Sequence, residues 1–136
     1  MSKPVHVAVG VIISTVEDHQ TQYFLTKRHD DVHQGGKWEF PGGKVEKDET
    51  IAQALARELK EEVNIEVLSC QPLLTIEHDY GDKKVCLSVF VVDNYIGEPS
   101  AQEGQKQRWA AIEEVKNLDF PKANEAIIAE LISRHS

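Results

Sequence analysis

The stretch Thr50–Val63 is the clearest helix in this sequence, and its polar pattern restricts how the chain can fold. It contains no Gly or Pro and is rich in Ala, Leu, Glu and Lys, residues that favour helices. At roughly 100° per residue, its Ile, Leu and Val side chains form one apolar face that must be buried against a neighbouring element. Glu58 and Glu62 fall inside that face, and Glu61 falls at its edge. The fold must therefore bury a helix whose inner face carries acidic groups.

These glutamates are spaced i, i+3 and i+4, so their carboxylates share one patch. Like charges beside apolar surface cost free energy unless cations neutralise them. Hard carboxylate oxygens suit Mg²⁺ or Mn²⁺ better than zinc, so the pattern indicates a divalent-metal site. The alternative is a Glu-rich helix whose boundary carboxylates simply reach solvent. Arg57, four residues before Glu61, either orients a carboxylate or forms an ordinary exposed ion pair.

The rest of the chain predicts strands on both sides of this helix and a second helix at the end. Pro41-Gly42-Gly43 indicates a chain reversal. The predicted strands are Val5–Ser14, Gln22–Lys27, Leu68–His78, Lys84–Tyr95 and Arg108–Ile112, and the second helix is Ala123–Arg134. This order indicates an α/β (α+β) fold, a mixed sheet with helices packed on it. No repeat or linker is visible, so residues 1–136 are expected to form one domain.

The charge balance and the cysteines exclude several classes of protein. The formal net charge is −8, which argues against stable binding to nucleic acids or anionic membranes. An acidic protein that acts on phosphates is expected to need divalent cations. Cys70 and Cys86 form no CxxC pair, so neither a disulfide framework nor a zinc site is expected. No run approaches the ~20 apolar residues of a membrane span, and the expected location is the cytoplasm.

Residues 43–65 resemble the Nudix box, the motif of the Nudix hydrolase family. The positions that carry the resemblance are Gly43, Glu49, Arg57, Glu58, Leu59, Glu61, Glu62 and Ile65. Asn64 stands where the family has Gly. Because Asn is the next-best residue after Gly in the left-handed region, Asn64 is predicted to end the helix there without loss of activity.

Further segments resemble MutT-type members of this family, in the same order along the chain. These segments are Ala8–Ile12, Glu39–Glu46, Gly97–Pro99 and Phe120–Glu125. The resemblance implies an α/β/α sandwich around a central mixed sheet. It also implies Mg²⁺-dependent, or Mn²⁺-dependent, hydrolysis of 8-oxo-dGTP to 8-oxo-dGMP and pyrophosphate by water attack at the β-phosphorus. Such an activity removes oxidised nucleotides before DNA replication and so avoids mutation.

The resemblance also implies a set of metal ligands. The carboxylates of Glu58, Glu61 and Glu62 are expected to bind the metal together with the main-chain carbonyl of Gly42. Glu103 matches a further family carboxylate, which holds a second metal or helps to activate water. Its alternative is an acidic loop residue. We favour Glu58 as the general base because its position on the helix is among the most buried, and burial favours the protonated carboxyl form.

Four other residues are candidate substrate contacts. Arg28 and Lys44 could bind the phosphates, because charge-assisted hydrogen bonds suit that anion; otherwise they are exposed cations. Phe40 and Asn124 match the positions that hold the base in MutT-type enzymes. An amide both donates and accepts, so it can pair with a purine edge. The alternative for Asn124 is an N-cap of the last helix. His33, His78 and Tyr80 lie in loops that could border the nucleotide, but a position at the surface is favoured for them.

Two other functions remain open alongside 8-oxo-dGTP hydrolysis. One is a Nudix hydrolase of a different substrate with a nucleoside diphosphate linked to another group. The other is a non-catalytic Nudix module that senses nucleotides. Such modules typically lose carboxylates from the box, whereas Glu49, Glu58, Glu61 and Glu62 are all present. In each case the partner is a small-molecule nucleotide, and the chain is expected to be a monomer.

Overall fold

The computed structural model describes residues 4–15, 21–30 and 35–135, and strand β1 (Val5–Thr15) lies at the centre of its sheet. β1 pairs in parallel with β6 (Lys84–Ile96) and antiparallel with β2 (Thr21–Lys27). The short β4 (Gly42–Lys44) also pairs with β1. Side chains of β1 are buried on both faces of the sheet, Val9 and Val11 in one core and Ala8 and Ile12 in the other.

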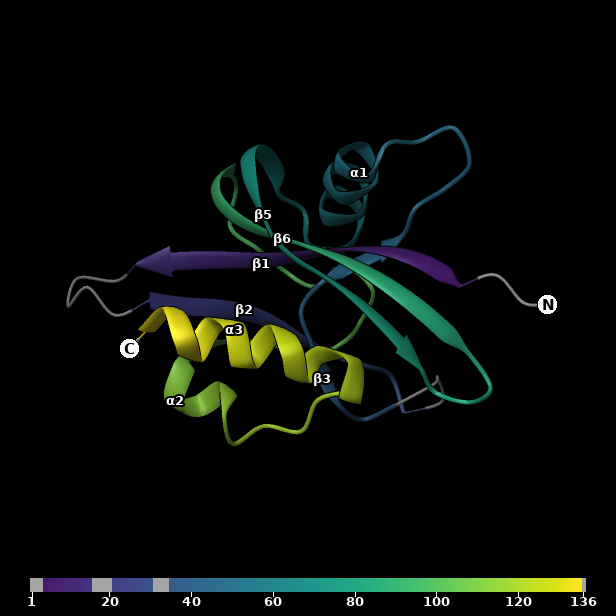
Figure 1. Ribbon diagram of the computed structural model, residues 1–136. Coiled ribbons are helices and arrows are strands. Elements are labelled where there is room, and N and C mark those ends of the chain that lie inside the picture. Colours follow the sequence, from purple (N-terminus) through teal and green to yellow (C-terminus); the bar gives the residue numbers. More distant parts are fainter. Residues whose placement is uncertain (1–3, 16–20, 31–34, 136) are drawn as a thin grey trace.

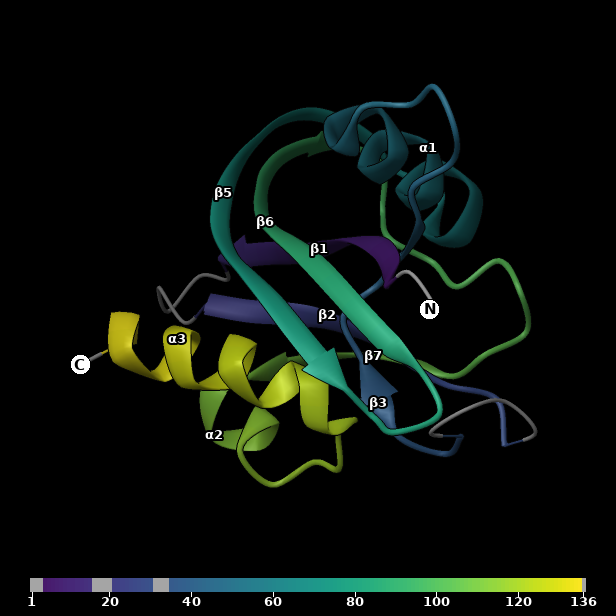
Figure 2. The same ribbon diagram turned by 45° about the vertical axis from the view of Figure 1, so that its right-hand side comes forward.

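The strand order is β3-β2-β1-β6-β5, with β7 paired to β2. β3 spans Trp38–Glu39, β5 spans Glu66–Asp79 and β7 spans Gln107–Ala111. All pairs except β1–β6 are antiparallel, which makes the sheet mixed. Figure 2 shows β5 and β6 as one long, curved pair.

Helices cover both faces of the sheet. α1 (Ile51–Val63) lies on one side, and α2 (Ile112–Val115) and α3 (Glu125–His135) lie on the other (Figure 1). Leu55 and Leu59 of α1 are fully buried in one core, while Ile127 and Leu131 of α3 are buried in a second core on the opposite face. The predicted mixed sheet between helices is confirmed.

Both ends of α1 have local signals in the sequence. The Thr50 side chain accepts a hydrogen bond from the Gln53 main chain at 3.1 Å, and the Gln53 side chain accepts one from the Thr50 main chain at 2.9 Å. This capping box starts the helix. Asn64 has φ 59° and ψ 40°, so the predicted left-handed helix end is confirmed.

The chain reverses direction around Pro41-Gly42-Gly43, as predicted. β3 is antiparallel to β2, and β2 and β4 are both antiparallel to β1, so β3 and β4 run in opposite directions. The reversal is not a hairpin, because β3 pairs with β2 whereas β4 pairs with β1. A Cβ atom at Gly42 would collide with the main chain of Ala8, so Gly42 is required by the close approach of β4 to β1.

Three short elements were missed, namely β3, β4 and α2. Each is too short to display a hydrophobic period. The last helix is preceded by a 3₁₀ turn, Lys122–Asn124, so the predicted start at Ala123 falls inside that turn. Both cysteines are free thiols, as expected. Within the described residues, none of the helices is long and apolar enough to cross a membrane.

Candidate active site

A cleft of about 330 Å³ opens between α1, β1, β4 and the segment before α3. It collects most of the residues singled out by the sequence, from positions far apart in the chain. The predicted residues that line it are Arg28, Phe40, Gly42, Lys44, Glu58, Glu62, Glu103 and Asn124. Arg57 and Glu61 are not among the lining residues.

Glu62 is the most deeply buried carboxylate of α1, with 7% of its surface exposed. Its Oε2 atom accepts a hydrogen bond from the Gly42 main-chain nitrogen at 3.2 Å, which ties α1 to β4. Glu58 is only half-buried. The expectation that Glu58 is among the most buried carboxylates therefore applies better to Glu62, because β4 covers the latter.

Burial and acidic surroundings make the charged form of Glu62 unfavourable. Burial, together with the nearby charges of Glu39, Glu103 and Glu58, raises the pKa of Glu62 to about 8, against the opposing effect of the Gly42 hydrogen bond. A carboxyl group with this pKa is largely protonated at neutral pH unless a cation neutralises its neighbours. The cleft thus contains an excess of negative charge around one buried group.

Arg57 lies behind the cleft and fixes the orientation of Glu58. Its Nη1 atom donates to Glu58 Oε1 at 2.6 Å and, more weakly, to Glu61 Oε2 at 3.4 Å. Its Nε and Nη2 atoms donate to the two oxygens of Glu49 at 2.7 and 3.0 Å, and Nη2 also donates to the Lys44 carbonyl at 3.0 Å. These hydrogen bonds hold the pKa of Glu49 down to about 2. The Arg57 and Glu58 side chains are only 26% and 20% exposed, which favours the orienting interpretation of Arg57 over an ordinary exposed ion pair.

Gly43 gives the Glu58 carboxylate its space. A Cβ atom at Gly43 would collide with the Glu58 carboxylate group. The carboxylate therefore lies against the β4 main chain, with Arg57 on one side and Gly43 on the other. No larger residue at position 43 would permit this arrangement.

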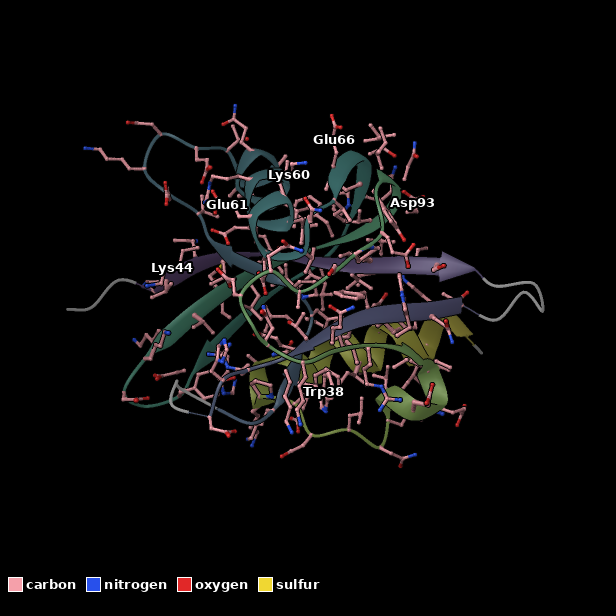
Figure 3. All side chains as sticks on the ribbon, turned by 180° about the vertical axis from the view of Figure 1, so that it is seen from behind. Trp38, Lys44, Lys60, Glu61, Glu66 and Asp93 are labelled. Carbon is pink, nitrogen blue, oxygen red and sulfur yellow. The ribbon has the colours of Figure 1, made fainter. Side chains whose placement is uncertain are left out.

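Glu61 and Glu103 lie further out. The Glu61 side chain is 61% exposed, and Figure 3 shows it on α1 with Lys60, away from Trp38. Glu103 lines the cleft from an exposed loop, where its carbonyl is 3.2 Å from His29 Nε2.

The oxygen atoms of the cleft carboxylates are suitable ligands for a divalent cation that binds to few protein groups. In the described ranges, no group of three or more His, Cys, Asp and Glu side chains could hold a metal ion between them. Mg²⁺, however, is commonly bound by one or two carboxylates, with water and substrate phosphates completing its shell. The carboxylate oxygens of Glu62 and of the acidic residues around it match that requirement. The full set of Glu58, Glu61, Glu62, Glu103 and the Gly42 carbonyl stays a prediction.

Sequence reasoning missed Glu39. Its Oε1 atom accepts a hydrogen bond from Arg28 Nη1 at 2.6 Å inside the cleft. Burial raises the pKa of Glu39, while the charge and hydrogen bond of Arg28 lower it. A charged residue between Trp38 and Phe40 was the available signal, since an acid flanked by two aromatic residues is unusual in a strand.

Away from the carboxylates, the cleft lining is largely apolar and includes the amide of Asn124. Phe40 stacks on Phe120 with ring centroids 5.5 Å apart. Asn124 is 9% exposed and lines the cleft. Among the described residues, its side-chain amide has no hydrogen-bond partner, so it does not cap α3. An amide in this environment is available to a ligand.

Tyr80 also lines the cleft, so the expectation of a surface position was wrong for it. The Ala123 main-chain nitrogen donates to the Tyr80 hydroxyl at 2.9 Å. His78 is half-buried against the Tyr80 ring, with centroids 4.4 Å apart. His33 lies outside the described residues.

Comparison with known families gives one match over most of the chain. The model of the NUDIX domain matches residues 10–130.

Curated relatives extend this similarity over almost the full length. The chain is 38% identical to the 8-oxo-dGTP diphosphatase of Escherichia coli K12 over 129 residues, covering 95% of this chain and 97% of that one. It is 32% identical to the CTP pyrophosphohydrolase of the same organism over 112 residues, covering 82% of each.

Among solved structures, a MutT structure from a study of the proteins of Aliivibrio salmonicida and Vibrio cholerae is similar. The TM-score is 0.84 at 36% sequence identity, and the match covers 97% of this chain and 99% of the other.

Proposed function

This chain belongs to the Nudix family, and we propose that it hydrolyses 8-oxo-dGTP to 8-oxo-dGMP and pyrophosphate. One observation carries the proposal: a single cleft is lined both by the α1 carboxylates Glu58 and Glu62 and by Phe40 and Asn124. The carboxylates suit the metal-bound phosphates of a nucleoside triphosphate, and the aromatic ring and amide suit its base. The family is dependent on divalent metals, and we propose Mg²⁺, with Mn²⁺ as the alternative, because the available donors are hard oxygens.

When bound, the cation would polarise phosphoryl oxygens and lower the pKa of a water molecule. We propose that Glu58, Glu61, Glu62, Glu103 and the Gly42 carbonyl hold it. We propose Glu58 as the group that accepts the proton of the attacking water. The reason is its fixed orientation between Arg57 and Gly43 rather than its burial. Arg57 keeps the Glu58 carboxylate in that position.

The other cleft residues would bind the substrate. Arg28 and Lys44 supply positive charge to the cleft, which offsets the repulsion between the phosphates and a chain of net charge −8. The Asn124 amide can both donate to and accept from the edge of an oxidised purine. Phe40 would support the base beside it.

The test is a pyrophosphate-release assay with Mg²⁺ on 8-oxo-dGTP, dGTP and CTP. Wild-type protein should give its highest kcat/KM with 8-oxo-dGTP. Glu62→Gln should lower kcat at least about 100-fold, the usual effect of losing a group that holds or moves charge in the reaction. The matched control is Glu66→Gln, an exposed carboxylate just beyond α1, which should leave turnover unchanged.

Other outcomes would select the alternatives. Preference for CTP would indicate a different Nudix substrate, a possibility raised by the CTP pyrophosphohydrolase among the relatives. Nucleotide binding without pyrophosphate release would indicate a non-catalytic module.

We further propose that residues 1–136 form one domain that acts as a cytoplasmic monomer on a free nucleotide, with no stable nucleic-acid or membrane partner. The exposed edge of the sheet supports the monomer. Strand β5 contains Pro72, and its pairing with β6 is interrupted by several register shifts. Both features discourage edge-to-edge pairing of two copies.

A further inference from the structure

The hydroxyl of Tyr80 connects two segments that are far apart in the chain. Tyr80 directly follows β5, in the turn that leads to β6. Ala123 lies in the 3₁₀ turn before α3, and its main-chain nitrogen donates to the Tyr80 hydroxyl at 2.9 Å. Both residues line the cleft. The hydrogen bond therefore joins the β5–β6 hairpin to the wall that carries Asn124.

The hairpin end of this connection is well fixed. The Tyr80 main-chain nitrogen donates to the Lys83 carbonyl at 2.8 Å, and Gly81 N donates to Asp79 Oδ1 at 2.7 Å. The Tyr80 ring packs edge-on against His78. Because turn, ring and neighbouring strand constrain one another, the hydroxyl has a defined position.

The other end determines where the Asn124 amide lies. Ala123 is 4% exposed, and the Asn124 main-chain nitrogen donates to the Pro121 carbonyl at 2.9 Å. Within the described chain, the Asn124 side chain makes no hydrogen bond that could hold it. Its direction therefore follows from the main chain of the 3₁₀ turn, one residue from the Tyr80 contact.

We propose that Tyr80 is a positioning residue for base recognition: its hydroxyl fixes the turn at Ala123 and thereby directs the Asn124 amide into the cleft. The inference rests on the proposed function, in which Asn124 reads the oxidised base. Loss of the hydroxyl leaves a buried main-chain N–H without its acceptor, and such a group moves toward another partner. The turn would shift, and the Asn124 amide would form weaker hydrogen bonds with the base.

The test compares Tyr80→Phe with Tyr95→Phe. The Tyr95 hydroxyl is likewise hydrogen-bonded to the main chain, here as the donor to the Ile13 carbonyl at 3.3 Å. Tyr95 is half-buried like Tyr80, but it does not line the cleft. Tyr80→Phe should raise KM for 8-oxo-dGTP roughly fivefold, as expected for one neutral hydrogen bond, with a smaller change in kcat. Its preference for 8-oxo-dGTP over dGTP should fall by a similar factor. Tyr95→Phe should change neither quantity.

A double-mutant cycle tests whether Tyr80 acts through Asn124. In the Asn124→Ala background, Tyr80→Phe should no longer alter KM or base preference, because the group it positions is absent. Amide hydrogen exchange gives a readout that does not depend on substrate. The Ala123 amide should exchange faster in Tyr80→Phe than in wild-type protein and at the wild-type rate in Tyr95→Phe.

The outcomes separate the inference from the proposed function. Unchanged exchange at Ala123, or an unchanged base preference in Tyr80→Phe, overturns the positioning role while the wild-type activity stands. An equal effect of Tyr80→Phe with and without Asn124 also overturns it. If the wild-type protein does not prefer 8-oxo-dGTP, the proposed function fails, and the positioning role fails with it.

Discussion

At the scale of single residues, Glu62 is a buried acid whose charge no cation compensates among the described residues. The pKa of Glu62 is about 8 because of burial, with the nearby negative charges as a further cause. In the unfolded chain a glutamate titrates near 4.3. Between these values the folded state binds more protons at Glu62 than the unfolded state does. The metal-free protein should therefore lose stability as the pH rises from about 4.5 to about 8.

Glu62→Gln should remove this contribution. We expect the variant to melt a few degrees higher than wild-type protein at pH 8 in EDTA, with little difference at pH 5. Calorimetric melts at both pH values measure this. Mg²⁺ should raise the melting temperature of wild-type protein at pH 8 and have much less effect on the variant. Equal pH dependence of the two proteins would contradict the assigned electrostatics.

Helical spacing predicted that Glu58 and Glu62 point inward, but it could not rank their burial. That ranking depends on β4, whose main chain covers Glu62 and leaves Glu58 beside Gly43. Glu39 and Tyr80 were missed for a related reason. The position of each side chain in the cleft depends on a hydrogen bond to a residue distant in sequence: Arg28 binds Glu39, and Ala123 binds Tyr80.

At the scale of elements, the contact between α1 and β4 forms the acidic part of the cleft. Gly43→Ala should displace the Glu58 carboxylate, which is the flexible end of a side chain and can move away. We expect kcat to fall at least tenfold, because small displacements of catalytic groups are costly, while the melting temperature changes little. Kinetics and thermal melts on the same preparation measure both.

Gly42→Ala provides the contrast. Its Cβ atom would collide with the main chain of Ala8, which cannot move without separating β1 from β4. This variant should lose stability as well as activity. If Gly43→Ala behaved in the same way, the space at Gly43 would serve the fold rather than the Glu58 carboxylate.

The end of α1 allows a second prediction. Asn64 has the left-handed conformation, and its main-chain nitrogen bonds the carbonyls of Leu59 and Lys60. Asn64→Gly should be neutral or stabilise the protein by a few tenths of a kcal/mol, and Asn64→Ala should destabilise it by about 1 kcal/mol. Urea unfolding of the three proteins measures these differences. A marked loss of stability in Asn64→Gly would contradict the role of the left-handed end.

At the scale of the whole molecule, the proposed monomer predicts a single species in sedimentation. The sheet edge at β5 is long, but its irregular pairing and Pro72 make it a poor template for a second copy. Sedimentation velocity at increasing concentration should therefore show no growth of a dimer. Leu68→Lys, a change at an exposed apolar position on β5, should leave the profile unchanged; a dimer that it dissociated would contradict the monomer.

The layers of the molecule could be predicted from the sequence, whereas the pairing of its strands could not. The long strands and both main helices have clear hydrophobic patterns. The parallel contact between β1 and β6, and the attachment of β4 to β1, are decided by packing between distant segments. The candidate site followed from the spacing of acids on α1, but its second wall depends on those distant contacts.

The same parallel pairing has a consequence for how the chain folds. Val5 pairs with Val85, so the central strand is made early in synthesis, whereas its principal neighbour is made much later. Contacts of such long separation close slowly. The hairpin of β5 and β6, which is local, is expected to form first and to provide the template to which β1 attaches. Until then the edge of β1 that receives β6 is an unpaired apolar edge, which exposes this strand to aggregation.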